Sequence, residues 1–197
     1  MRFIFGTVLS LLLGAAVAQG PTLRERVARA HTDVALTVNV DGPVVTLEQI
    51  LAETDLVVRG SVGRATAKLS ADEREITTTY EIVNPQVSFS KSYAQAARPG
   101  LPTRVITVTQ PGGTVSIGAF TATIRYDDAE MLKTGTDVIV LLRDDRESYA
   151  ISGRAGMFEV RDARIVPLAK RRGEHQRFAG MTPEVFLVAL RKALKQP

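Results

Sequence analysis

The stretch DLVVRGSVGRATAKL (residues 55–69) decides the fold, because its apolar positions change phase along a single strand. Up to Gly60 the apolar side chains occupy one set of alternating positions, and beyond Gly63 they occupy the other set. A bulge or sharp bend at a glycine explains such a shift without ending the strand. Long bent strands are how a small sheet curls into a barrel. We therefore expect residues 55–69 to form one bent strand.

The residues that follow predict two hairpins. Ser70-Ala71-Asp72-Glu73 is a polar segment typical of a turn, and residues 75–84 return with alternating apolar and polar positions. Residues 103–109 and 114–126 are expected to flank a second turn, because Gln110-Pro111-Gly112-Gly113 matches the type II pattern of Pro followed by Gly.

Two later segments complete the predicted sheet. Gly118 shifts the apolar phase within residues 114–126, which indicates another bend in a strand. Val138 to Leu142 is apolar at every position, so we expect this strand to be the most buried. With the short strands that continue to residue 166, the sequence predicts about seven or eight strands.

Helices are expected on both sides of the strands. Residues 22–31 have the apolar spacing of a short helix, and Thr46 and Gln49 have capping-box spacing ahead of a helix over residues 47–53. Thr182-Pro183 is typical of a helix start near the C-terminal end. The predicted fold is therefore mainly β: a small closed or strongly curled antiparallel β-barrel with short N-terminal helices and a C-terminal helix.

The first eighteen residues have the pattern of an export signal. Arg2 precedes an apolar run over residues 3–17, and the small residues Ala16 and Ala18 stand at the positions that signal peptidase requires. We expect cleavage after Ala18 and an exported protein, periplasmic or secreted. The alternative is an uncleaved anchor.

These patterns divide the chain into four parts. The expected parts are a signal peptide (1–18), an N-terminal extension with a helix and a strand (19–45), a β-barrel domain (46–168), and a basic connector with the C-terminal helix (169–197). The chain has no Cys, which excludes disulfides, thiol catalysis and thiolate metal sites. A formal net charge of only +4, with no Trp, argues against a nucleic-acid partner.

Three segments carry a resemblance to a known group of proteins. They are Leu47 to Val62, above all Asp55 to Gly60, then Val105 to Gly113, and Gly135 to Arg143. In these segments the chain resembles uncharacterised exported bacterial proteins of no assigned activity, over roughly residues 46–166. The resemblance implies a small β-barrel of the oligonucleotide/oligosaccharide-binding (OB) type or a near relative. It implies no functional residues, because the shared motifs are structural.

One pair of motifs indicates an enzyme. Ser88 and Lys91 form an S-x-x-K motif, and Lys133 begins a K-T-G motif, as in penicillin-interacting serine enzymes. That chemistry needs the Ser at a helix N-terminus, one turn before its Lys. Here the surrounding residues predict a strand, in which positions 88 and 91 point to opposite faces. A serine acyl-transfer or hydrolase enzyme is therefore the alternative to a non-enzymatic module.

The remaining side chains that could act in catalysis or bind a metal form no recognisable site. His31 and His175 are far apart in the chain, and we interpret both as separate surface residues. Asp127-Asp128 and Asp144-Asp145 lack the alternating spacing of a calcium loop and are interpreted as turn acids. We predict no catalytic, cofactor-binding or metal-binding residues, and no cofactor.

Two segments are candidates for binding. We expect residues 91–102 to form a long loop in which Tyr93 and Arg98 contact a ligand, the alternative being a disordered hairpin tip. Lys170-Arg171-Arg172 forms a basic cluster suited to weak contact with an anionic surface, the alternative being a solvated connector. The sequence thus predicts an exported, non-enzymatic envelope or secreted module that binds an unknown protein or small molecule.

Overall fold

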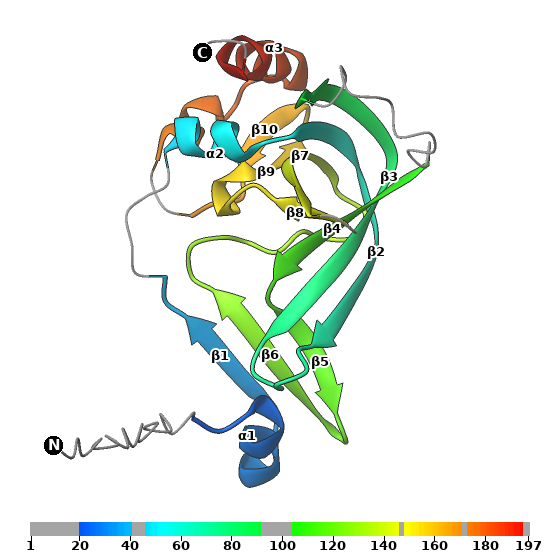
Figure 1. Cartoon of the computed structure of the whole chain (residues 1–197), viewed down its shortest axis with the longest axis vertical. Coiled ribbons are helices and arrows are strands. Elements are labelled where there is room, and N and C mark those ends of the chain that lie inside the picture. The colour runs from blue at the N-terminus through cyan, green and yellow to red at the C-terminus, as the bar shows by residue number, and fades with distance from the viewer. Residues whose placement is uncertain (1–19, 41–45, 92–103, 146–147, 171–172, 195–197) are drawn as a thin grey trace, which may run out of the picture.

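The protein is mainly β, as predicted, with a closed barrel and helices towards both ends. The computed structural model describes residues 20–40, 46–91, 104–145, 148–170 and 173–194. The predicted signal peptide lies outside these residues. Within them, the strands form one seven-stranded and one three-stranded sheet (Figure 1).

The helices and strands follow one another along the chain with these bounds: α1 (Leu23–Ala30), β1 (Val34–Val38), α2 (Leu47–Glu53), β2 (Leu56–Leu69), β3 (Ile76–Ser90), β4 (Val105–Pro111), β5 (Gly113–Ile117), β6 (Phe120–Tyr126), β7 (Asp137–Asp145), β8 (Ser148–Ile151), η2 (Arg154–Gly156), β9 (Met157–Arg161), β10 (Arg164–Pro167), η3 (Glu174–Phe178) and α3 (Pro183–Leu194).

Five strands of the larger sheet close into the barrel. β2 pairs with β3 and β7, β3 pairs with β4, and β7 pairs with β8, all antiparallel. β4 and β8 close the circle in parallel, through the two residue pairs Val108–Tyr149 and Thr109–Ala150. The expected antiparallel barrel therefore has one parallel seam, and that seam is short.

The glycine-marked bends in β2 are confirmed. The pairing of β2 with β3 shifts register between Arg59 and Ser61 and again between Val62 and Ala65. A side chain at Gly60 would place its Cβ 2.7 Å from Ile82 Cγ2 and 2.8 Å from the carbonyl oxygen of Val83. The strand bends here because the two backbones approach more closely than any side chain allows.

The second predicted hairpin is wrong. β4 pairs with β3 and β5 pairs with β6, so Pro111-Gly112 does not join two paired strands. Gly112 has the positive φ of 99° that a Pro-Gly turn favours, but the chain uses it to pass from one sheet to the other. Gly118, with φ 64°, does not bend a strand; it lies in the tight turn between β5 and β6.

The three-stranded sheet forms a lower layer with its own core. β1 pairs in parallel with β6, so the strand of the N-terminal extension belongs to this sheet. α1 covers the sheet through Leu23 and Val27, which pack with Ile76 at the start of β3 (Figure 1). The backbone amide of Leu23 donates to the carbonyl oxygen of Glu73, which ties α1 to the β2–β3 turn.

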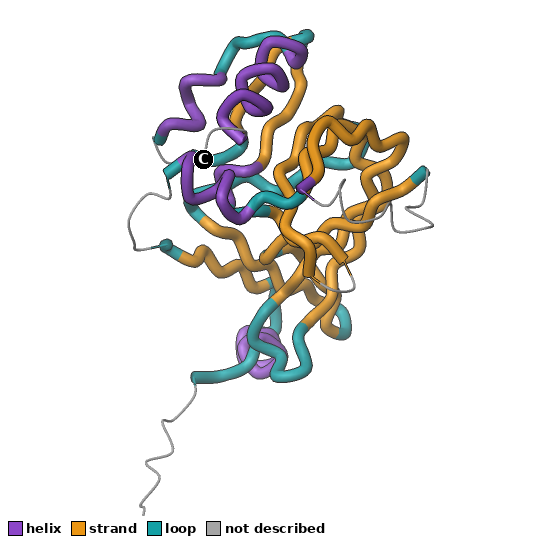
Figure 2. The backbone as a smooth tube through the Cα atoms, turned by 45° about the horizontal axis from the view of Figure 1, so that its top comes forward, coloured by secondary structure: helices purple, strands orange, loops and turns teal. Residues whose placement is uncertain are grey.

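Two further cores lie on the two faces of β7. Val138, Val140 and Leu142 point into the barrel, whereas Ile139 and Leu141 point to a second core beneath α2, η3 and α3. All five side chains are fully buried, which confirms the expectation that this strand is the most buried. Figure 2 shows α2 and α3 together on one side of the strands, with α1 at the opposite end.

The predicted helix starts are also confirmed. Thr46 accepts a hydrogen bond from the Gln49 amide, and the Gln49 side chain accepts one from the Thr46 amide, so both bonds of the capping box form before α2. α3 begins at Pro183, as the sequence predicts. Because α2 is held at its first turn, its last residue, Glu53, has a defined place beside the barrel.

Candidate functional site: a cleft at the parallel seam

A cleft opens where β4 and β8 separate. The two strands pair only up to Thr109 and Ala150 and then diverge, because β4 leads into the lower sheet and β8 leads into the turn before β9. The cleft has a volume of about 530 Å³. Its lining residues come from α2, β3, β4, β7, β8 and the segment that enters β9: Glu53, Thr77, Thr109, Gln110, Pro111, Arg143, Ala150, Ile151, Gly153 and Met157.

One wall of the cleft is polar and rigid. The buried Gln110 side chain donates to the carbonyl oxygen of Glu130 at 3.1 Å and accepts from the amide of Leu132 at 3.3 Å. Thr109 donates to the carbonyl oxygen of Tyr149 at 3.5 Å, across the seam. The Thr77 hydroxyl makes no hydrogen bond to any other residue that the structure describes, so it is available to a ligand.

The floor of the cleft is apolar. Met157 is fully buried and packs in the barrel core, and the half-buried Ile151 packs against the same core. Pro111 and Ala150 extend this apolar surface towards the opening. A ligand in the cleft would therefore contact Ile151, which lies directly over the barrel core.

A pair of opposite charges completes the lining. Arg143 of β7 lies opposite Ala150 of β8, and its Nη1 is 3.6 Å from Oε2 of Glu53 at the end of α2. The two side chains are 52% and 56% exposed, respectively. They are the charged residues of the cleft lining among the described residues, and together they carry no net charge.

The structure does not bring the residues of the serine-enzyme alternative together. Ser88 lies in β3 beside Val57 and Val58 of β2, whereas the turn that contains Lys133 bonds to Val62. Five residues along a strand separate these places by about 17 Å. Lys91 follows β3, and its Nζ donates to the carbonyl oxygen of Ala52 at 2.6 Å. Lys133 lies 3.5 Å from Glu130.

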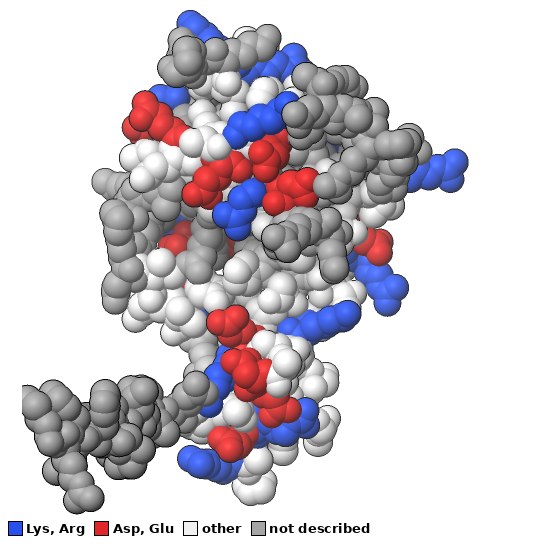
Figure 3. Space-filling model, in the orientation of Figure 1, with Lys and Arg blue, Asp and Glu red and all other residues white. Residues whose placement is uncertain are grey.

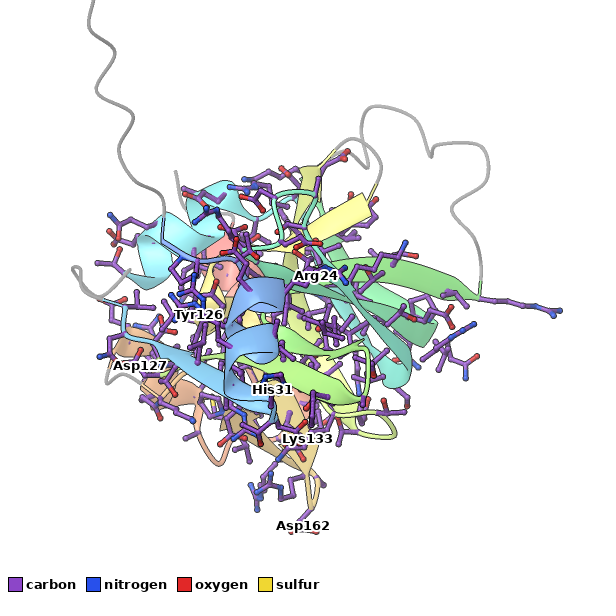
Figure 4. The ribbon with its side chains drawn as sticks, turned by 90° about the horizontal axis from the view of Figure 1, so that it is seen from below. Arg24, His31, Tyr126, Asp127, Lys133 and Asp162 are labelled. Carbon is purple, nitrogen blue, oxygen red and sulfur yellow. The ribbon has the colours of Figure 1, made fainter. Side chains whose placement is uncertain are left out.

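One of the two histidine predictions is wrong. His31 is exposed and ends α1, as Figure 4 shows, but His175 is 2% exposed and therefore not a surface residue. His175 lies in η3 beside the Gln176 side chain, at 3.1 Å between their Nε2 atoms. Phe178 of the same η3 packs with residues of α2, β7 and α3, so the burial of this segment depends on contacts that are distant in the chain.

The acidic pairs do not gather into a metal site. Asp127 accepts from the amide of Val40 at 3.1 Å, and Asp144 and Asp145 lie within β7 instead of the expected turn. Across the described ranges, no three His, Cys, Asp or Glu side chains are placed to hold a metal ion.

The other predicted binding segments lie largely outside the described residues. Of the basic cluster, Lys170 is described and exposed, while residues 171–172 are not described. Of the loop over residues 91–102, only Lys91 is described, so Tyr93 and Arg98 fall outside as well. On the face drawn in Figure 3, acidic and basic groups lie side by side over the upper and lower parts of the molecule.

The cleft itself was not predicted from the sequence. Its residues come from segments as far apart as Glu53 and Met157, and the turn pattern that contains Gln110 and Pro111 indicates no binding site. The one signal was the buried Gln110, which follows Ile106 and Val108 at inward positions of β4. A polar side chain at such a position needs hydrogen-bonding partners and indicates a polar edge of the core.

Comparisons of the chain with protein-family models, with curated proteins and with solved structures find no match. In the part of the chain that the structure describes, every helix is too short or too polar to cross a membrane.

Proposed function

We propose that the protein is an exported, non-enzymatic binding module that holds a small molecule in the cleft between β4 and β8. The cleft is the observation that carries this proposal. Its volume lies within the range of roughly 300–1,000 Å³ that is typical of small-molecule sites. Its mixture of an apolar floor with a few fixed polar groups is also typical of such sites.

The proposal includes a barrel of the OB type. Around the barrel the strands lie in the order β2, β3, β4, β8 and β7. Numbered by their position in the chain, this is the order 1-2-3-5-4. OB barrels bind ligands over their second and third strands. Thr77 of β3 and Thr109 of β4 lie on these strands and line the cleft, which supports the assignment.

Localisation and surface contacts remain part of the proposal. Export rests on the signal-like pattern of residues 1–18. On the face drawn in Figure 3 the charges of both signs are interleaved, and among the described residues of that face no continuous basic surface of the kind that nucleic acids favour is drawn, which supports the expectation that nucleic acid is not the partner. The exposed Lys170 supports weak contact of the Lys170-Arg171-Arg172 cluster with an anionic surface.

The test is a screen of small molecules by protein NMR. Amino acids, short peptides, sugars and nucleosides are added one at a time to the full chain without its predicted signal peptide. We expect at least one class to shift the backbone amides of Thr77, Thr109 and Ala150. Shifts confined to other parts of the molecule, or no shifts with any class, would overturn the proposal.

Filling the cleft supplies the matched control. Ala150→Trp places a large side chain in the cleft, so we expect it to abolish the shifts. Thr114→Trp adds the same side chain at an exposed position of β5, in the other sheet, and should leave the shifts unchanged. Equal loss in both variants would show that the shifts do not report binding in the cleft.

A further inference from the structure

The charges of the cleft restrict the kind of ligand that it can hold. Glu53 and Arg143 contribute one charge of each sign to the lining. A ligand with a single charge would satisfy one of these groups and leave the other beside an apolar floor without its partner. A ligand that carries both charges satisfies the two groups together.

The ion pair can open at little cost. Its two charged groups make one contact of 3.6 Å, longer than a hydrogen bond, and both side chains are more than half exposed. Exposed pairs of this kind contribute about 0–1 kcal/mol to stability. A carboxylate can therefore take the place of Glu53 on Arg143, where the guanidinium offers two parallel donors. An ammonium group can in turn bind Glu53.

The cleft places an apolar surface beside these charges. Ile151 and Pro111, with the buried Met157 beneath them, form a surface that suits an aliphatic side chain. The hydroxyls of Thr77 and Thr109 lie along the wall, where they can bond to the peptide group of a ligand. Gln110 serves as a fixed part of the wall, because both ends of its amide are already bonded.

Resting on the proposed function, we infer that the cleft binds a zwitterion with an aliphatic side chain, as found in a free apolar amino acid or a short apolar peptide. The carboxylate of the ligand binds Arg143, its ammonium group binds Glu53, and its side chain contacts Ile151 and Pro111. The volume of about 530 Å³ leaves room for more than one residue. Free amino acids and short peptides present the same two charged groups, so the experiment compares leucine with Leu-Leu to distinguish them.

The experiment measures binding by calorimetry to leucine, Leu-Leu, N-acetyl-Leu-Leu and Leu-Leu-amide. We expect the wild-type chain to bind Leu-Leu about two- to fivefold more tightly than either capped dipeptide, because each cap removes one contact to a half-exposed charged group. Tighter binding of Leu-Leu than of leucine would identify peptides as the ligand, and the reverse would identify amino acids. Either result supports the inference.

Variants assign each charge to its residue. With Arg143→Gln, Leu-Leu and Leu-Leu-amide should bind equally, and with Glu53→Gln, Leu-Leu and N-acetyl-Leu-Leu should bind equally. Arg24→Gln and Glu73→Gln each remove one charge of the ion pair at α1, whose side chains are 60% and 31% exposed and whose charged atoms are 2.7 Å apart. This pair is remote from the cleft, so both variants should leave all affinities unchanged. The inference would be overturned if the caps did not weaken binding, or if the cleft variants bound all four ligands as the wild type does.

The result also separates this inference from the proposed function. If neither leucine nor Leu-Leu binds, but other compounds of the NMR screen shift the cleft amides, the ligand class is wrong and the binding module stands. If no compound shifts those amides, both are wrong.

Discussion

The buried hydroxyl of Thr78 donates a hydrogen bond of 2.6 Å to the carbonyl oxygen of Gly112. This bond joins β3 to the point where the chain leaves the barrel for the lower sheet. Thr78→Val keeps the shape of the side chain but leaves a buried carbonyl without its donor. We expect the free energy of unfolding to fall by about 1–3 kcal/mol, as measured by urea denaturation. Thr107→Val, at an exposed position of β4, should change it by less than about 0.5 kcal/mol. Equal losses would contradict this role of the bond.

Gly60→Ala tests the close approach of β2 and β3. The added methyl group would lie within 3 Å of Ile82 and of the backbone at Val83, so one strand must move. We expect a loss of about 1–3 kcal/mol in the free energy of unfolding, measured by thermal and urea denaturation. Gly20→Ala is the control, since no atom lies within 4 Å of its Cβ position. A Gly60→Ala protein as stable as the control would show that the bulge does not need glycine.

The bend at Gly60 also shows which features could be predicted from the sequence. Alternation along β2, capping at Thr46 and the apolar run in β7 are local, so the residues that cause them are neighbours in the chain. The Pro111-Gly112 prediction was wrong because turn residues specify a backbone angle and not the partner strand. The position of that segment is set by Thr78 and Ile76, which are remote in sequence and form hydrogen bonds with Gly112.

The cleft lay beyond prediction for a related reason. It exists because two strands meet in parallel for two residue pairs and then diverge, and parallel closure leaves no periodic pattern in either strand. The Glu53–Arg143 pair joins residues of α2 and β7 whose proximity depends on the whole barrel. His175 was misplaced because its burial depends on packing among segments that are distant in the chain.

Tyr80 should make stability fall at alkaline pH. Burial raises the pKa of its hydroxyl from 10.0 to about 12. Between these values the unfolded chain has lost a proton that the folded protein retains, so the free energy of unfolding decreases as the pH rises. The contribution is complete below pH 10 and is lost as the pH passes through about 12. Urea denaturation from pH 8 to 11 should show a steeper decline for the wild type than for Tyr80→Phe. Parallel curves would contradict the prediction.

The serine-enzyme alternative has a direct test. Ser88 lies beside Val57 and Val58 of β2, whereas the turn that contains Lys133 bonds to Val62, about 17 Å away along the strand, which is too far for shared chemistry. We therefore expect a fluorescent penicillin to leave the purified protein unlabelled, as judged by gel fluorescence beside a known penicillin-binding enzyme. Labelling that disappears in Ser88→Ala would establish the enzyme instead.

β2 and β3 are long enough to contribute side chains to two separate hydrophobic cores. Val62 and Ile82 lie in the barrel core, whereas Leu69 and Ile76 on the same two strands lie in the lower core. Loosening one core therefore releases the shared strands and weakens the other. The barrel and its lower layer should therefore unfold together, so that a cavity made in the core beneath α1 lowers the stability of the barrel as well.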